Sequence, residues 1–123
     1  MAESEKRYKD LNVWQEARKL SKNIYSLTSE FPKEEQFGLI NQMRRCAISV
    51  PSNIAEGCGR NYPKDSIQFF YIARGSIYEL ETQLYLSFDL EYLEELKLNQ
   101  LLTLTETTRK LLSGFIKYYQ QIK

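Results

Sequence analysis

The chain has 123 residues, of which 42% are hydrophobic and 27% charged, and its net charge is +1. This length suits about one domain with a core of its own, and only five glycines and three prolines favour long helices over many short strands. No apolar run reaches the roughly 20 residues that span a bilayer. Residues 1–10 are charged and lack the apolar stretch of a signal peptide. We therefore expect a cytoplasmic protein that has no membrane partner.

The histidine and cysteine content limits the catalytic and metal-binding chemistry that the chain can support. The chain contains no histidine, which removes the commonest general base, the usual nucleophile pairs and nearly all ordinary zinc sites. Cys46 and Cys58 fall mostly within one predicted helix, where their Cα atoms would lie roughly 18 Å apart, too far for a disulfide. We expect two free thiols, no cofactor and no metal, and we do not expect an enzyme.

The first predicted helix covers about residues 10–30. Asp10 suits its N-cap, and Phe31-Pro32 ends it because a residue before proline avoids the helical region. Apolar residues recur between these limits at gaps of three and four, as on one face of a helix. This apolar stripe comprises Trp14, Ala17, Leu20, Ile24, Leu27 and Phe31.

The second predicted helix covers about residues 34–57. Its stripe comprises Ile40, Met43, Ala47, Val50 and Ile54. Pro51 removes the hydrogen bond to the Ala47 carbonyl, so we expect a kink there, with Ser49 or Ser52 donating to the freed carbonyls. Gly57 and Gly59 provide the stop. The stretch from Glu56 to Arg60 is either this simple helix stop or a backbone nest for an anion.

The third and fourth predicted helices cover about residues 64–88 and 91–121. The third stripe comprises Phe70, Ala73, Ile77, Leu80 and Leu84, and the fourth comprises Leu101, Thr105, Thr108, Leu112, Phe115, Tyr119 and Ile122. Four amphipathic helices joined by short connections favour an antiparallel up-down-up-down bundle. The sequence therefore predicts one all-α four-helix-bundle domain over residues 1–123.

Two groups of residues are candidates for a subunit interface. Tyr71, Tyr78 and Tyr85 repeat every seven residues beside the third stripe, where they either pack at the bundle edge, contact another subunit or stack on bases. The fourth helix has more leucine than one core needs, including Leu98, Leu102 and Leu104. A surplus apolar face usually marks an interface, so we expect self-association.

Charge is unevenly distributed along the chain. Residues 1–78 carry a balance of +3, residues 79–108 a balance of −6, and residues 109–123 a balance of +4. The basic residues form either an ordinary solvated surface or a surface that binds phosphates. The candidates for nucleic-acid binding are Arg7, Lys9, Arg18, Lys22, Arg44, Arg45, Arg60, Lys64 and Arg74.

Carboxylates raise a separate question. Glu56, Glu79 and Glu81 lie in the two middle helices, but metal sites of helical bundles combine glutamate with histidine. A hydrogen-bonded polar cluster with Asn53, Ser76 or an arginine is the better interpretation.

Several segments together resemble a known family. They are Leu11–Ala17, Phe37–Leu39, Gln42–Arg45, Ser49–Gly57, Gly59-Arg60, Ile72–Ser76 and Glu79–Glu81. The chain is similar over nearly its whole length to the four-helix-bundle proteins encoded by intervening sequences within bacterial 23S ribosomal RNA genes, and the segment Ser-Val-Pro-Ser-Asn-Ile-Ala-Glu-Gly is quite specific.

The resemblance implies homo-oligomers, typically pentameric rings, without established enzymatic activity. A related branch, the accessory variability proteins of diversity-generating retroelements, binds nucleic acid and a reverse transcriptase. The matching polar positions Asn53, Glu56, Ser76 and Glu79 are expected to hold the second helix against the third.

Two hypotheses for function follow. The first is a non-enzymatic oligomer that binds RNA or DNA through phosphate contacts. The second is an assembly scaffold that docks a protein partner through the acidic segment Glu79 to Glu106.

Overall fold

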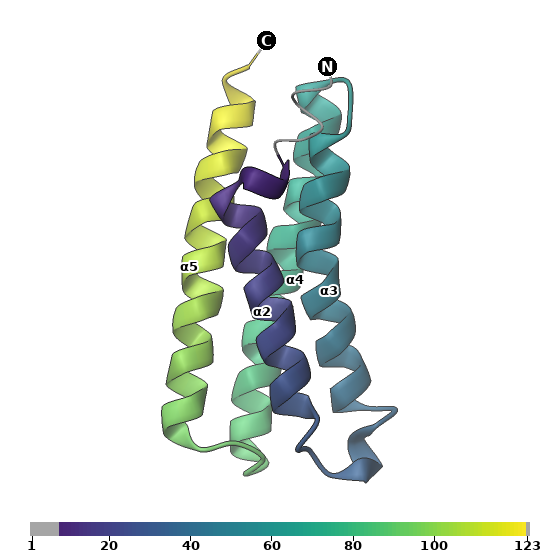
Figure 1. Cartoon of the computed structure of the whole chain (residues 1–123), viewed down its shortest axis with the longest axis vertical. Helices are drawn as coiled ribbons and strands as arrows, with labels where there is room; N and C mark the ends of the chain where they lie inside the picture. The colour runs from purple at the N-terminus through teal and green to yellow at the C-terminus, as the bar shows by residue number, and fades with distance from the viewer. Residues whose placement is uncertain (1–7, 123) are drawn as a thin grey trace.

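The computed structural model describes residues 8–122, which form one bundle of four α-helices without any strand in this range (Figure 1). The elements are the 3-10 turn η1 (Tyr8–Asp10), α2 (Asn12–Thr28), the 3-10 turn η2 (Lys33–Glu35), α3 (Leu39–Cys58), α4 (Pro63–Asp89) and α5 (Glu95–Gln120). Consecutive helices run in opposite directions, so α2 begins and α5 ends at the same end of the bundle (Figure 1). The packed pairs are α2 with α3, α3 with α4, α4 with α5, and α5 with α2. The predicted all-α bundle is confirmed.

The predicted apolar stripes meet in the core. Every stripe residue of α3 and α4 is buried. In α2 the stripe is buried except for Trp14, and Val13 takes the core position beside it. In α5 the stripe holds as far as Leu112, after which Ile116 is buried and Phe115 is only half-buried. A helix of 3.6 residues per turn drifts away from a 3.5-residue stripe, which explains the shift near the end of α5.

The predicted starts of two helices are wrong by four or five residues. Residues 33–38 form η2 and a turn, so α3 begins at Leu39 rather than near residue 34. The Glu35 carboxylate accepts the backbone N–H of Leu39 at 3.2 Å, which satisfies one of the amides that a helix start leaves free.

The connection between α4 and α5 explains the second error. Glu91 has φ 65°, the left-handed region in which a side chain is unfavourable. The Glu91 and Tyr92 amides donate to the carbonyls of Phe88 and Ser87 at 2.9 Å, which is the Schellman arrangement that closes a helix. Glu91 is therefore part of the turn that closes α4 and cannot start the next helix, so α5 begins at Glu95 rather than at residue 91.

Pro51 does not interrupt α3, which continues from Leu39 to Cys58. The Ala47 carbonyl, which lacks its usual donor because proline has no N–H, instead accepts the Ser21 hydroxyl of α2 at 2.7 Å. The expected donors Ser49 and Ser52 do not fill this role. The compensation for the proline therefore comes from a neighbouring helix and ties α2 to α3.

Gly57 lies inside α3 and does not end it. A Cβ at this position would lie 2.4 Å from a ring carbon of Phe70 and 2.9 Å from the Ser66 carbonyl, so glycine permits the close approach of α3 and α4. Gly59 caps the helix with a right-handed φ of −83°. The amides of Gly59 and Arg60 donate to carbonyls of the last turn, so this segment is a helix stop and not an anion nest.

Candidate nucleic-acid interface

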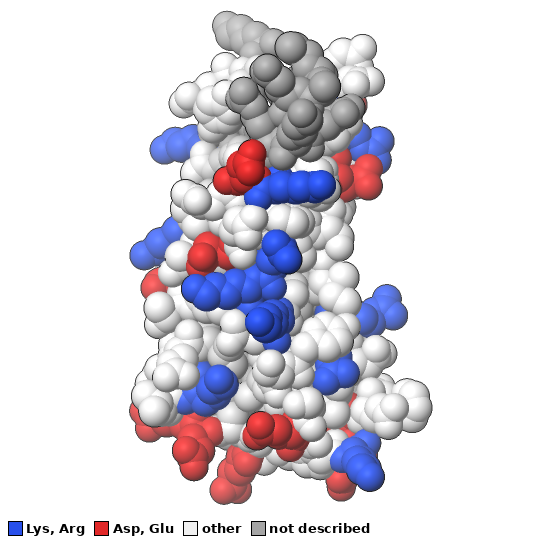
Figure 2. All heavy atoms as spheres, in the orientation of Figure 1, with Lys and Arg blue, Asp and Glu red and all other residues white. Residues whose placement is uncertain are grey.

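Four cations form what we call the basic surface. Arg18, Lys19 and Lys22 are exposed on α2, and Arg45 is exposed on the adjacent helix α3. None of the four forms an ion pair with a carboxylate in the part of the chain that the structure describes. The Ser21–Ala47 bond sets the register of the two antiparallel helices and places Arg45 close to the level of Lys22. Figure 2 shows blue side chains gathered midway along the face that α2 presents.

Arg18 also stacks on an aromatic ring. Its guanidinium carbon lies 5.2 Å from the centre of the Trp14 ring, within the range of a cation–π contact. Trp14, which was predicted to belong to the core stripe, is partly exposed. A positive charge and a flat aromatic side chain therefore lie together on the surface. Proteins that bind single strands combine these two features.

Arg44 has a structural role, although it adjoins Arg45 in sequence. Its Nε donates to the Thr28 hydroxyl at 2.8 Å and its Nη2 donates to the Tyr25 carbonyl at 3.3 Å. The guanidinium lies 4.4 Å from the centre of the Tyr25 ring. Arg44 therefore holds α3 to the last turn of α2, where a cation also offsets the negative end of the helix dipole.

The arginines of the α4–α5 side are likewise engaged. Arg74 donates to the Ser113 hydroxyl at 3.3 Å and lies over Tyr71. Arg109 pairs with Glu81 at 3.4 Å and lies over Tyr78.

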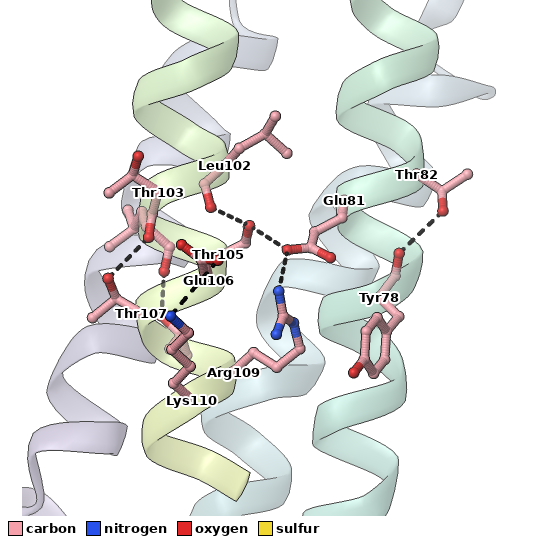
Figure 3. Close-up of polar contacts among 12 residues, drawn as sticks. Tyr78, Glu81, Thr82, Leu102, Thr103, Thr105, Glu106, Thr107, Arg109 and Lys110 are labelled. Atoms are coloured by element: carbon pink, nitrogen blue, oxygen red, sulfur yellow. Dashed lines mark hydrogen bonds and ion pairs between the residues drawn. The ribbon is translucent and has the colours of Figure 1, made fainter.

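Glu81 is the centre of this second network. Its Oε2 accepts the Thr105 hydroxyl at 2.9 Å as well as the Arg109 donor (Figure 3). The Arg109 Nε is buried without a partner among the described residues. The sequence predicted that Glu81 belongs to a hydrogen-bonded polar cluster, with an arginine as one possible partner, and not to a metal site. It did not single out Arg109 as that partner, because an arginine–glutamate pair between two helices carries no local sequence signal.

The remaining basic candidates lie near the ends of helices. Arg60 pairs with Glu56 at 2.8 Å and covers Phe69, while Lys9 and Lys64 are exposed. Arg7 lies outside the described residues. The structure therefore brings Arg18, Lys22 and Arg45 to neighbouring helices and assigns Arg44, Arg60 and Arg74 to intramolecular contacts.

The predicted polar cluster forms only in part. Asn53 donates to the Ser49 carbonyl and hydroxyl at 2.9 Å, and Ser76 of α4 donates to the Ser49 hydroxyl at 2.9 Å. Glu56 turns toward Arg60 instead, and Glu79 is exposed. The junction of α3 and α4 is thus held by hydroxyl and amide groups, and the two carboxylates are not part of it.

The interface candidates divide into exposed and buried groups. Tyr71, Tyr78 and Tyr85 remain exposed along α4. Leu98 is only 5% exposed and belongs to the core, so its assignment to a subunit interface is wrong. Leu102 and Leu104 are partly buried and pack against the same core.

The carboxylates gather at one end of the molecule. We call this region, which contains the end of α2, η2 and the α4–α5 connection, the acidic end. Its charged residues are Glu30, Lys33, Glu34, Glu35, Asp89, Glu91, Glu94, Glu95 and Lys97. Figure 2 shows red side chains concentrated there, below the blue group. Two apolar side chains nearby are unusually exposed, Phe37 at 89% and Leu96 at 71%.

The thiols are packing groups. Both cysteines are free. Burial raises the pKa of the Cys58 thiol to about 11 and that of the neighbouring Tyr119 hydroxyl to about 12, so both groups stay protonated at neutral pH. Among residues 8–122, no three cysteine, aspartate or glutamate side chains lie together in a way that suits a metal ion. No helix of this range is long and apolar enough to cross a membrane.

Comparison with known proteins places the chain in a family. The family model for the 23S rRNA-intervening sequence protein matches residues 9–114. A crystal structure from Bacteroides thetaiotaomicron, described as a protein of unknown function from the S23 ribosomal protein family, has the same fold with a TM-score of 0.77. The two share 23% sequence identity over 85% of this chain and 98% of that chain. No curated protein matches the chain. Because the family match spans most of the sequence, from η1 to the last third of α5, the chain belongs to the 23S rRNA-intervening sequence protein family.

Proposed function

We propose that this protein is a non-catalytic, homo-oligomeric bundle that binds nucleic acid through phosphate contacts. The observation that carries the proposal is the basic surface, in which Arg18, Lys19, Lys22 and Arg45 are exposed and have no carboxylate partner among the described residues. Contacts of lysine and arginine with phosphates supply most of the sequence-independent affinity of such proteins.

The position of the acidic end supports this proposal. Arg18 and Lys22 precede Thr28, the last residue of α2, by roughly 9 to 15 Å along the helix. The Debye length at physiological salt is about 8 Å, so the carboxylates at the acidic end only weakly oppose a phosphate bound at these cations. A protein with a net charge of +1 therefore still offers a locally positive surface, and oligomerisation would repeat it.

RNA is the nucleic acid to test first, because the description of the family refers to 23S rRNA. Filter binding of an RNA duplex at two salt concentrations provides the test, with light scattering to establish the oligomer. We expect log K to fall linearly with log salt, by about 0.9 for each phosphate contact. Absent or salt-independent binding at low salt would eliminate this function.

The acidic end favours a second candidate function, a scaffold that docks a basic protein segment. Phe37 and Leu96 would supply apolar anchors beside the carboxylates, and charge complementarity would steer the partner. A labelled lysine-rich amphipathic peptide tests this candidate. Binding that is lost in Glu34→Lys/Glu94→Lys but retained when the basic surface is neutralised would favour it.

A further inference from the structure

Arg18 differs from the other arginines that stack on aromatic rings. Its guanidinium carbon lies 5.2 Å from the centre of the Trp14 ring, yet the group forms no hydrogen bond or ion pair with any residue of the described range 8–122. The other stacked guanidiniums are bonded to protein groups, and they belong to Arg44, Arg60, Arg74 and Arg109. The N–H donors of Arg18 therefore remain available to a ligand while the ring supports the guanidinium plane.

Trp14 belongs to a row of stacked side chains at the start of α2. The Tyr8 ring of η1 meets the Trp14 ring edge-on, with the ring centres 5.2 Å apart. The Nζ of Lys9 lies 5.9 Å from the centre of the Tyr8 ring. Two partly exposed rings thus lie between two exposed cations, Lys9 and Arg18. This aromatic row suits a ligand that is both flat and negatively charged.

Few carboxylates oppose such a ligand. α2 contains one acidic residue, Glu16, which lies about 200° around the helix from Arg18. α3 also contains one, Glu56, which forms an ion pair with the arginine one turn further on. Asp10 follows Lys9 in η1 and offsets the charge of that lysine only. The Arg18 end of the aromatic row therefore carries an unopposed positive charge.

The spacing of the cations along α2 suits a nucleic-acid strand. Arg18 and Lys22 follow Trp14 by four and eight residues, which is roughly 6 and 12 Å along the helix. About three to four stacked nucleotides at roughly 3.4 Å each cover the same length. Phosphates that flank a base at Trp14 would therefore lie within reach of both cations.

An aromatic ring favours unpaired nucleotides over a duplex. Within a continuous duplex each base is covered by the base pairs next to it, so a protein ring cannot stack on its face. The bases of single-stranded loops, bulges and ends can stack on aromatic side chains and on guanidinium planes. The aromatic row would therefore add affinity only for the unpaired part of an RNA, whereas the basic surface contacts phosphates of either form.

We propose that the aromatic row stacks an unpaired RNA base on the Trp14–Arg18 pair, while Lys22 contacts a flanking phosphate. This inference rests on the proposed function and names its preferred ligand, a single-stranded or bulged RNA segment. The similar pair of Tyr78 and Arg109 on the α4–α5 side does not have this role, because Arg109 is bonded to Glu81.

An abasic oligomer separates base stacking from phosphate contacts. Fluorescence anisotropy at low salt compares a short unstructured RNA with an oligomer of abasic spacers that has the same length and charge. We expect the unaltered protein to bind the RNA about tenfold more tightly, because stacking of one base on an aromatic side chain contributes at least an effect of this order.

Three variants locate the stacking. Trp14→Leu removes the ring but keeps an apolar side chain against the core, and it should weaken binding of the RNA about tenfold. Binding of the abasic oligomer and of a continuous duplex should stay unchanged, which also shows that the variant is folded. Trp14→Phe keeps a ring and should retain most of the affinity for the RNA. Tyr78→Leu is the matched control and should leave all three affinities unchanged.

The outcomes distinguish this inference from the proposed function. If the unaltered protein binds the RNA and the abasic oligomer equally, no base stacks on the protein, although its phosphate contacts stand. If Trp14→Leu weakens binding of the abasic oligomer or the duplex as much as that of the RNA, or if Tyr78→Leu has the same effect, stacking at Trp14 is wrong. Absent binding of all three ligands at low salt would overturn the proposed function and this inference with it.

Discussion

The α2–α3 side and the α4–α5 side of the bundle use the same residue type in opposite ways. On α4 and α5, Arg74 and Arg109 bond to a serine and a glutamate of the facing helix. On α2 and α3, Arg18 and Arg45 face the solvent and have no carboxylate partner among the described residues. The number of arginines therefore says little about binding. What matters is which of them the helix packing leaves unengaged.

The same division occurs between adjacent residues of α3. A helix turns by about 100° per residue, so Arg44 points toward α2 and bonds to Thr28, while Arg45 points into the solvent. Single substitutions of these two residues are therefore the smallest changes that separate the structural role of Arg44 from the proposed binding role of Arg45.

Removing charge from the basic surface should have the largest effect. We expect Arg18→Gln/Lys22→Gln/Arg45→Gln to lower the affinity for an RNA duplex roughly 100-fold at low salt and to reduce the salt slope by two to three. The matched control removes the same charge from the exposed lysines of α5, as Lys97→Gln/Lys110→Gln/Lys117→Gln. Fluorescence anisotropy measures both variants, and an equal loss in the two would mean that only net charge matters.

Breaking the network of the α4–α5 side should affect stability and not binding. Glu81→Ala removes the partner of Arg109 and one of the two acceptors of the Thr105 hydroxyl, the other being the Leu102 carbonyl. It should lower the free energy of unfolding by about 2 kcal/mol. Glu106→Ala is the control, since its 3.8 Å pair with Lys110 is exposed and contributes at most about 0.5 kcal/mol. Urea denaturation gives both values, and a large loss of RNA affinity in Glu81→Ala would show that the α4–α5 side also contributes to binding.

The adjacent arginines of α3 should show the same division within one helix. Arg44→Gln should lower the free energy of unfolding by about 1 kcal/mol because two hydrogen bonds to α2 are lost, with little change in affinity. Arg45→Gln should leave the free energy of unfolding within about 0.5 kcal/mol and weaken RNA binding several-fold. Urea denaturation of the two single variants measures their free energies of unfolding, and fluorescence anisotropy measures their affinities for RNA. The reverse result would show that the roles of the two side chains are misassigned.

The smallest expected effect concerns the bond that links α2 to α3 beneath the basic surface. Pro51 already deprives the Ala47 carbonyl of its backbone donor. Ser21→Ala removes the hydroxyl group that donates to this carbonyl instead. We expect a loss of at most about 1 kcal/mol in the free energy of unfolding. Ser52→Ala is the control, because Ser52 is exposed and makes no such bond. Equal stability of the two variants in urea would show that the Ser21 bond contributes nothing.

The apolar stripes could be predicted from sequence because a helix repeats its buried positions every three or four residues, and Phe70, Ile77 and Leu84 illustrate this. The helix starts could not be predicted as well. The start of α3 depends on the Glu35 side chain, which accepts the Leu39 amide, and the start of α5 depends on the left-handed backbone of Glu91, a conformation that the residue type does not indicate.

The candidate site was predictable only as a set of cations. Which of them remain unengaged depends on the facing helix, and a sequence read one segment at a time does not contain that information. Helical periodicity places Arg44 beside the apolar stripe and Arg45 nearly opposite to it, but the bond of Arg44 to Thr28 on α2 could not be predicted from the sequence. Pro51 illustrates the same limit, because its compensating donor lies 26 residues upstream of Ala47.

Lysine footprinting shows whether RNA lies on the basic surface. Brief acetylation followed by mass spectrometry, with and without a saturating RNA duplex, reports the accessibility of each lysine in the protein. We expect RNA to protect Lys19 and Lys22 on α2 and to leave Lys97 and Lys110 on α5 unchanged. Protection of the α5 lysines with Lys19 and Lys22 still reactive would contradict it.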